Sequence, residues 1–243
     1  MLRNDNWHDS QIACAADLEN GKSSDICYIA IALLTTSASG TSMALGTFPT
    51  TELTRDQLVK VGNAIIYLAE RIKPLYKTKV LKLLYLLDEA SVQEIGIPMF
   101  ALEYRAWRMG PVSKEIYVDI DDGPHLLKEF IRVVRDEMGD RVESARSFDD
   151  GEFSDRDMRM LSEMAGDLGR RKASDLVDLT HDKQSLWYQL AKENNLLEAF
   201  EQEQRNTSDV VLDLGRLVAN DPFKRGLYAE HQEFLQVHRA LKG

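Results

Sequence analysis

The sequence predicts a mostly α-helical α+β fold, in which a helical domain carries one small antiparallel sheet or hairpin. Apolar residues recur at helical spacing over most of the chain after residue 53, and favourable capping residues precede several of these segments. Only a few short runs have the composition of strands. Hydrophobic residues make up 44% of the 243 residues, which is enough to form a buried core.

Three parts are predicted along the chain. Residues 1–52 are interpreted as a weakly structured or accessory extension, because they contain a stretch rich in Ser, Thr, Gly and Ala that lacks a helical period. Residues 53–205 form the main domain, and residues 206–243 form C-terminal helices packed on it. Met43 lies just before the first clear helix signal, so two readings of residues 1–42 stay open: a mis-assigned start, and a small packed helix.

Two helices are expected at the beginning of the main domain. Thr54 is a favourable N-cap, and Gln57 stands at the capping-box position. An apolar stripe follows at spacings of 3, 4, 3 and 4, formed by Leu58, Val61, Ile65, Leu68 and Ile72. A second helix is expected over residues 77–95, with Gly96 as its C-cap. Its centre is apolar nearly all round, which places it in the middle of the domain.

The next segment favours a strand, a turn and a short helix. Residues 99–109 suit a short strand, and Gly110 and Pro111 predict a turn after it. Ser113 is expected to cap a short helix that ends at about Ile120.

A hairpin and further helices are expected in the rest of the domain. The runs 130–136 and 141–148 have strand composition, and residues 137–140 predict a longer loop between them. Ser154 caps the next helix, with Asp157 at the third helical position. Additional helices are predicted over residues 173–180, 186–201, 208–219 and 222–241.

Composition narrows the classes of function. The formal net charge of −10 repels phosphate backbones and weakens any interpretation as a general nucleic-acid-binding protein. Cys14 and Cys27 lie outside the main domain and form no CxxC pattern, which fits a reducing compartment. The most apolar run, residues 26–34, is nine residues long, whereas a membrane span needs about 20. We therefore expect a cytoplasmic protein without a membrane partner.

Patterns typical of catalysis are missing from the sequence. Neither GxGxxG, GxxxxGK[ST] nor GxSxG occurs. His231 and His238 are seven residues apart on one expected helix, a rise of about 10 Å that is too long for a shared metal ion. His181 lies near a helix end, where a favourable interaction with the helix dipole is expected. We expect no catalytic residue, no cofactor, no metal and no enzymatic activity.

The segment Tyr104–Val112 combines aromatic residues, two arginines and a rigid turn in an otherwise acidic protein. Tyr, Trp and Arg dominate protein interfaces. Strand alternation places Tyr104 and Arg108 on one face and Trp107 on the other, and one of these faces must be core. An interface role and a structural role for this segment both stay open.

Six short motifs follow one another in order. They are KLLYLLD at residues 82–88, AWRMGPV at 106–112, EIY at 115–117, EFSD at 152–155, LVDLTH at 176–181, and Trp187. Together they resemble the Panacea domain, also called the SocA-like antitoxin domain, over about residues 55–200. Leu86 and Met109 depart from the residues that are common in this family, Phe and Tyr or His respectively.

The resemblance implies an antitoxin of a type II toxin–antitoxin pair of bacterial or phage origin. Such an antitoxin neutralises its cognate toxin protein by direct contact. The family-motif or partner-binding residues that the resemblance suggests are Tyr85, Tyr104, Trp107, Arg108, Gly110, Pro111, Tyr117, His181 and Trp187. Because family members pair with diverse toxins, these shared residues can instead serve the fold, with the contact surface in the extension or the last helices.

Three other functions are alternatives to the antitoxin hypothesis. The resemblance also allows a proteolytic adaptor that delivers a toxin to a ClpXP-type protease. A DNA-binding regulator of its own operon, with operator DNA as partner, would use the basic residues Lys77, Lys79, Lys82, Arg132, Arg135, Arg141 and Arg146. An enzyme with a scattered active site is a further alternative. The acidic charge argues against DNA and suits a basic toxin, because opposite charges speed association.

Overall fold

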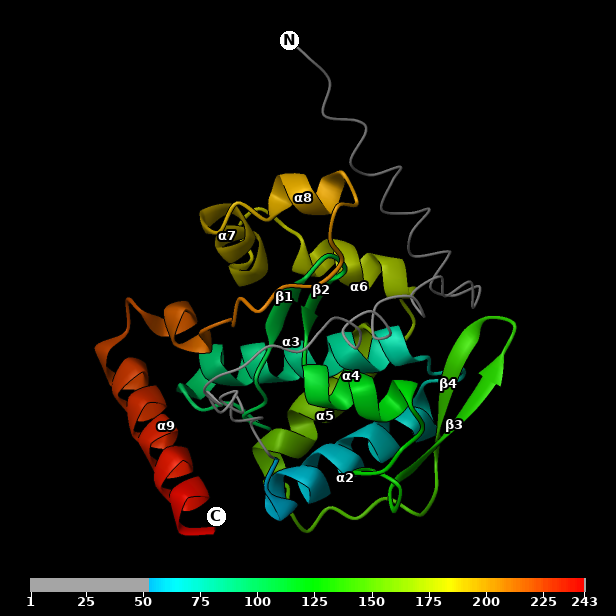
Figure 1. Ribbon diagram of the computed structural model, residues 1–243. Coiled ribbons are helices and arrows are strands. Elements are labelled where there is room, and N and C mark those ends of the chain that lie inside the picture. The colour runs from blue at the N-terminus through cyan, green and yellow to red at the C-terminus, as the bar shows by residue number, and fades with distance from the viewer. Residues whose placement is uncertain (1–52, 243) are drawn as a thin grey trace, which may run out of the picture.

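The computed structural model describes residues 53–242, in which helices dominate (Figure 1). The eight α-helices of these residues are α2 (Arg55–Arg71), α3 (Lys77–Ile95), α4 (Lys114–Asp121), α5 (Asp155–Asp167), α6 (Ala173–Thr180), α7 (Leu186–Glu193), α8 (Leu197–Glu201) and α9 (Pro222–Lys242). A 3₁₀-helix, η1 (Leu214–Val218), precedes α9. The strands form two antiparallel pairs, β1 (Arg105–Trp107) with β2 (Gly110–Val112) and β3 (Ile131–Asp136) with β4 (Gly139–Ser144). The mostly helical class is confirmed, with two small sheets where one was expected.

Helix α3 runs through the centre of the molecule, and the other elements pack around it (Figure 1). All residues from Val80 to Asp88 are buried, as the nearly all-round apolar pattern predicts. The helix has the predicted bounds and ends at Gly96, which adopts a left-handed conformation with φ of 81°. This central helix therefore carries groups that face several other elements at once.

Helix α2 begins with the predicted capping box. The Thr54 hydroxyl accepts the Gln57 N–H at 3.2 Å, and the Gln57 amide oxygen accepts the Thr54 N–H at 3.0 Å. The Gln57 side chain also donates to the carbonyl oxygen of Phe100 at 3.1 Å. The capping residue thus fixes the segment that leads into β1 as well as the helix itself.

The predicted turn at Gly110 and Pro111 is wrong, because both residues belong to β2. Gly110 pairs with Trp107, and the two residues between them make the turn. A φ of 98° at Gly110 is accessible mainly to glycine and allows this tight reversal. Pro111 faces Ala106, whose N–H points away from β2 to the carbonyl of Val210, so the ladder needs no donor from proline at this position.

The predicted helix over residues 208–219 is also wrong. Residues 206–212 lie extended along the outer edge of β1, and only residues 214–218 form η1. Three backbone hydrogen bonds of 2.8 Å join this segment to β1, from Arg108 N to Asn206 O, from Ala106 N to Val210 O, and from Leu212 N to Tyr104 O. Pairing with β1 satisfies backbone groups of an otherwise open strand edge, and the β-branched Val210 and Val211 suit an extended chain.

The hairpin of β3 and β4 is confirmed, but its loop is shorter than predicted. Only Glu137 and Met138 separate the paired residues Asp136 and Gly139. The Asp136 carboxylate accepts the N–H of Met138 at 2.9 Å and stabilises this two-residue loop. Strand β4 ends at Ser144, short of the predicted end at residue 148.

The later helices follow the predictions with one interruption. The helix predicted over residues 186–201 is divided into α7 and α8 near Asn195, which has a left-handed φ of 55°. Asparagine tolerates this conformation better than most residues, so the chain can bend there. Helix α6 has the predicted bounds, and α9 agrees within a residue.

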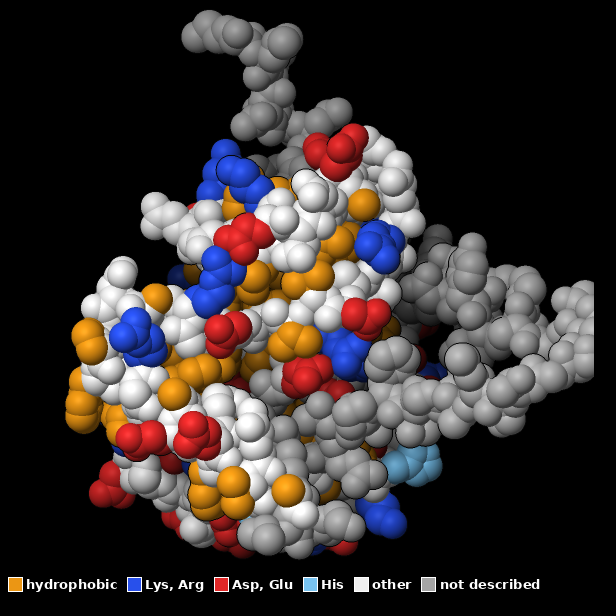
Figure 2. Space-filling model, turned by 60° about the vertical axis from the view of Figure 1, so that its left-hand side comes forward, with side chains coloured by type: hydrophobic (Ala, Val, Ile, Leu, Met, Phe, Trp, Pro, Cys, Tyr) orange, Lys and Arg blue, Asp and Glu red, His pale blue; other side chains and the backbone are white. Residues whose placement is uncertain are grey.

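The predictions for residues 1–52, including Cys14, Cys27 and Met43, lie outside the described residues. The division of the chain at residue 205 also stays a prediction. Within residues 53–242, no helix combines the length and the apolar character needed to cross a lipid bilayer. On the side that carries α9, hydrophobic side chains reach the surface in small groups between charged ones (Figure 2).

Candidate functional site

The nine motif residues come from elements around α3, and none of them is exposed. Tyr85 lies on α3, Trp107 on β1, Tyr117 on α4, His181 at the end of α6 and Trp187 on α7. Six are buried, namely Tyr85, Tyr104, Gly110, Pro111, His181 and Trp187, and three are half-buried, namely Trp107, Arg108 and Tyr117. The fold brings these segments together in its interior, and we call this group the motif cluster.

Trp187 is the centre of one half of the motif cluster. Its indole Nε1 donates to the carbonyl oxygen of Trp107 at 2.9 Å. Its ring stacks on His181, with ring centroids 3.9 Å apart, and on Phe200 at 6.2 Å. Trp187 is 0% exposed. A single side chain thus joins β1, the end of α6, and α8.

His181 is the C-cap residue of α6, which confirms its predicted position near a helix end. Burial, followed by the nearby charge of Lys82, holds the pKa of His181 well below its usual value. The imidazole is therefore neutral near pH 7, and the expected interaction of a charged histidine with the helix dipole is not made.

Lys82 is a buried amine that connects α3 to the β1–β2 hairpin. Its Nζ donates to the carbonyl oxygen of Pro111 at 3.0 Å, and the residue is 1% exposed. Burial lowers the pKa of Lys82 to about 7. A Cβ atom added at Gly110 would lie 2.7 Å from this Nζ and 2.7 Å from the Thr180 hydroxyl, so only glycine fits between them.

Asp88 joins α3 to the chain before β1. Its carboxylate accepts the N–H of Phe100 at 2.6 Å and the Tyr104 hydroxyl at 2.9 Å. Burial raises the pKa of Asp88 to about 6, against the lowering effect of these hydrogen bonds. Tyr104 packs edge-to-face against Tyr85 at 5.2 Å, and the Tyr85 hydroxyl donates to Glu89 at 3.0 Å. Tyr104 is therefore tied to α3 both by its packing on Tyr85 and by its hydrogen bond to Asp88.

The arginines of the β1–β2 hairpin form ion pairs within the molecule. Arg108 pairs with Glu203 at 2.7 Å, and Arg105 pairs with Glu103 at 3.0 Å and with Asp209 at 2.8 Å. Glu203 and Asp209 belong to the segment that approaches and follows β1. These arginines hold that segment in place, in addition to its backbone hydrogen bonds.

Trp107 and Tyr117 make the outer part of the cluster. Their rings meet edge-to-face at 5.0 Å, and the Lys77 amine lies 4.7 Å from the centre of the Tyr117 ring. Lys77 also forms ion pairs with Asp121 and, at 2.9 Å, with Asp140. Helix α4 and the β3–β4 hairpin are thereby connected to β1.

Sequence reasoning did not assign roles to Lys82, Asp88 or Thr180 in this cluster. A signal was present, because Lys82 and Asp88 are charged residues within an apolar helical run, where a charge needs a specific partner. Their partners come from residues at least 12 positions away and could not be chosen from the sequence. The buried polar groups of the motif cluster hold backbone segments and aromatic rings in place by hydrogen bonds. Their role is structural.

The basic residues considered for DNA binding are mostly engaged within the protein. Lys79 donates to backbone oxygens of Gly169 and Arg171, and Lys82 is buried. On the hairpin, Arg135 pairs across the strands with Asp140 at 3.2 Å. Arg141 pairs across the strands with Asp136 at 3.2 Å and within β4 with Glu143 at 3.1 Å. Arg146 lies over the ring of Phe130 at 4.4 Å. Most of these residues are therefore paired or buried, whereas Arg132 and Arg146 form no ion pair within residues 53–242.

Comparison with known proteins gives a family match. The family model described as Antitoxin SocA-like, Panacea domain, matches residues 80–188. No curated protein and no solved structure matches the chain. The matched segment begins on α3 and ends on α7, so it contains every residue of the motif cluster. Residues 80–188 are therefore similar to the Panacea domain of the SocA-like antitoxin family.

Proposed function

We propose that the protein is an antitoxin that neutralises a cognate toxin protein by direct protein–protein binding and catalyses no reaction. The observation that carries this proposal is the Panacea domain over residues 80–188, with the motif residues packed together inside the fold. The family implies a toxin partner, and a packed interior supports a rigid binding scaffold.

The burial of most of the motif cluster indicates that these residues support the fold, whereas other residues contact the toxin. Trp187, Tyr104 and Tyr85 are each at most 1% exposed, so a partner cannot reach them without rearrangement of the fold. The six buried motif residues thus serve the scaffold, and the proposed contact surface lies mainly outside them, which agrees with a family whose members pair with different toxins. A stable complex of this kind buries at least about 1,200 Å² in total.

Charge favours a protein partner over DNA. The net charge of −10 repels a phosphate backbone, and the basic residues near α3 and the hairpin are mostly paired or buried. A toxin with a basic surface would be drawn to this protein, because complementary charge raises the rate of association.

Co-expression in a bacterial host tests this function. The neighbouring open reading frame is induced alone and then with this protein, and a tag on this chain is used for co-purification. We expect the neighbour to stop growth alone, and this protein to restore growth and to co-purify with it at a constant ratio.

Two other outcomes contradict direct neutralisation. If growth is restored while the neighbour disappears from the cell, and deletion of a ClpXP-type protease returns it, the protein is a proteolytic adaptor. If the neighbour is harmless, or growth is not restored, the antitoxin assignment fails, and a salt-dependent gel shift with operon DNA then tests the regulator alternative.

A further inference from the structure

An open groove lined by both charged and apolar side chains lies between α5 and the C-terminal half of α3. Its volume is about 650 Å³. Met160, Met164 and Leu168 of α5 and the segment after it, together with Ala90 of α3, supply apolar lining. Methionine adapts its shape to different partners and is enriched in protein interfaces. The apolar part of this lining suits apolar side chains of a partner.

Charged residues at one end of the groove form ion pairs with one another, and the arginines at the other end do not. Arg159 pairs with Glu94 at 2.6 Å and with Glu163 at 3.4 Å, so these rim carboxylates already have a cation. Arg170 and Arg171 form the opposite end of the rim. Within residues 53–242, neither guanidinium forms an ion pair, and both residues are exposed.

The corner that carries these two arginines is held in place by Lys79. Its amine donates to the carbonyl oxygens of Gly169 at 3.2 Å and Arg171 at 2.5 Å. Gly169 packs closely on the protein, because an added Cβ would lie 2.8 Å from the Ile72 side chain. The backbone beneath the arginines is therefore fixed, while their exposed side chains can meet a partner.

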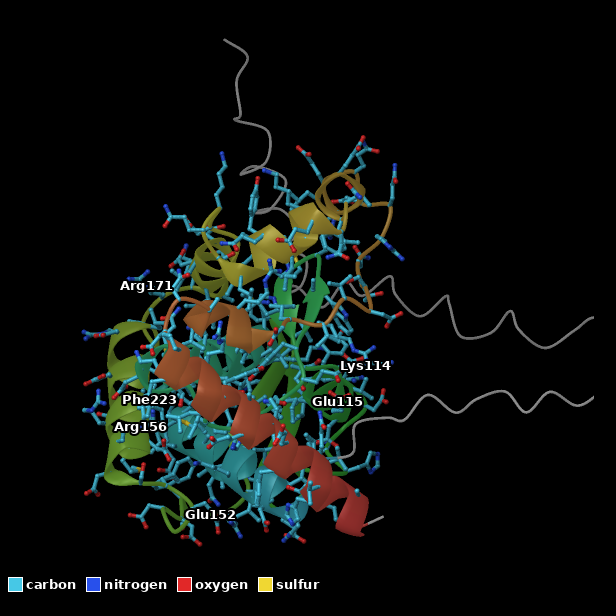
Figure 3. The ribbon with its side chains drawn as sticks, turned by 90° about the vertical axis from the view of Figure 1, so that its left-hand side faces the viewer. Lys114, Glu115, Glu152, Arg156, Arg171 and Phe223 are labelled. Carbon is cyan, nitrogen blue, oxygen red and sulfur yellow. The ribbon has the colours of Figure 1, made fainter. Side chains whose placement is uncertain are left out.

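An exposed aromatic residue lies on the same side of the molecule. Phe223, in the first turn of α9, is 75% exposed. Its neighbour Lys224 donates to the carbonyl oxygen of Gln93 at 2.7 Å, which places this turn at the end of α3 that also supplies Glu94. Figure 3 shows Arg171 and Phe223 on the side of α5, with Lys114 on the other side.

We propose that the toxin docks on this groove, and that the groove receives an amphipathic segment of the toxin with carboxylates at one end. Its apolar side chains pack on Met160 and Met164, and its carboxylates bind Arg170 and Arg171. This inference rests on the proposed antitoxin function and names the surface that carries it. Arg binds carboxylates through two parallel hydrogen bonds, and such pairs give orientation as well as affinity.

A nucleic acid fits the groove less well than a peptide of mixed charge. Two arginines at one end match a carboxylate pair, but Asp167, which forms no ion pair within residues 53–242, also lines the rim. A phosphate backbone running along the groove would meet this carboxylate and be repelled. A peptide can place its acidic residues at the arginine end alone.

Matched variants test the groove against the opposite side. Arg171→Glu and Met164→Glu alter the groove. Lys114→Glu makes the same charge change as Arg171→Glu on an exposed residue of α4, and Val118→Glu places a carboxylate at a position that is 41% exposed. The full chain is used throughout, and thermal unfolding establishes that each variant folds like the parent protein.

The affinity for the purified product of the neighbouring open reading frame is measured by calorimetry at two salt concentrations. We expect each groove variant to weaken binding about tenfold or more, equivalent to about 1.4 kcal/mol. Each control variant should change affinity less than about twofold, which is below about 0.5 kcal/mol. The loss in Arg171→Glu should diminish at high salt, because screening weakens the charge contribution.

The outcomes separate this inference from the function on which it rests. If the parent protein neither binds nor neutralises the neighbour, the proposed function fails. If the parent neutralises it and the groove variants bind as tightly as the parent, or lose no more than the matched controls, the docking site is elsewhere and the antitoxin function stands. If Arg171→Glu instead abolishes binding of an oligonucleotide and leaves toxin binding intact, the groove is a nucleic-acid site and this inference is overturned.

Discussion

The indole Nε1 of Trp187 donates to the carbonyl oxygen of Trp107 at 2.9 Å, across 80 positions of sequence. This bond joins the first motif-bearing half of the Panacea domain to its second half. It also explains why a tryptophan is useful at position 187, because the large ring fills the interior while its N–H satisfies a backbone carbonyl.

Removal of this donor should destabilise the protein. Trp187→Phe keeps an aromatic ring but leaves the Trp107 carbonyl oxygen without its donor, and we expect a loss of about 1–3 kcal/mol. Trp187→Ala also removes the buried ring and should cost about 3–5 kcal/mol. Urea unfolding measures both. Tyr188→Phe on the same helix is the control, and an equal loss there would contradict a specific role for the bond.

Gly110 should tolerate a methyl group less well than Gly123. Both residues have positive φ, 98° and 92°, so alanine brings a similar backbone cost of about 1 kcal/mol at each position. At Gly110 the added Cβ would also lie 2.7 Å from Lys82 Nζ, whereas nothing lies within 4 Å at Gly123. We expect Gly110→Ala to lose at least about 1 kcal/mol more than Gly123→Ala in urea unfolding. Equal losses would show that the hairpin moves away from Lys82 without cost.

The buried amine of Lys82 should make stability depend on pH. The folded-state pKa is about 7, against a usual 10.5, so between these values the unfolded chain binds a proton that the folded chain has released. The free energy of unfolding of the parent protein, compared with that of Lys82→Met, should therefore rise as the pH increases from about 7 to about 10. The total rise should be about 1.4 kcal/mol for each pH unit between the folded and unfolded pKa values of Lys82. Below pH 7 the difference should be constant, because both states are protonated.

Unfolding of the two proteins in urea at a series of pH values measures this difference. Taking the difference cancels the titration of other groups, such as Asp88. Lys128→Met, on an exposed lysine, is the control and should show no such slope. A flat difference for Lys82→Met would mean that the amine keeps its proton in the folded protein throughout this range.

Truncation should locate the end of the folded unit. A chain that ends at residue 205 loses the segment that pairs with β1, whereas a chain that ends at residue 220 keeps it. We expect the amide hydrogens of Ala106 and Arg108 to exchange rapidly in the shorter chain and to stay protected in the longer one. Hydrogen exchange with mass spectrometry measures this. Protection in both chains would support the predicted division at residue 205.

The sequence by itself determined the helical framework. Period and capping set the bounds of α3 and α6 and the capping box of α2, because these features depend on residues within a few positions of one another. The order of the motifs along the chain also indicated the Panacea family, and the family match over residues 80–188 agrees with it.

Only the tertiary structure decided what lies along β1 and which groups meet in the interior. A helix was predicted over residues 208–219, but the backbone of residues 206–212 bonds to a strand about 100 positions away. Lys82 found a backbone carbonyl at Pro111 and lies near His181, partners that no spacing rule could select. Such contacts depend on how separate elements pack, and the energy of burying a polar group is set by the partner that packing supplies.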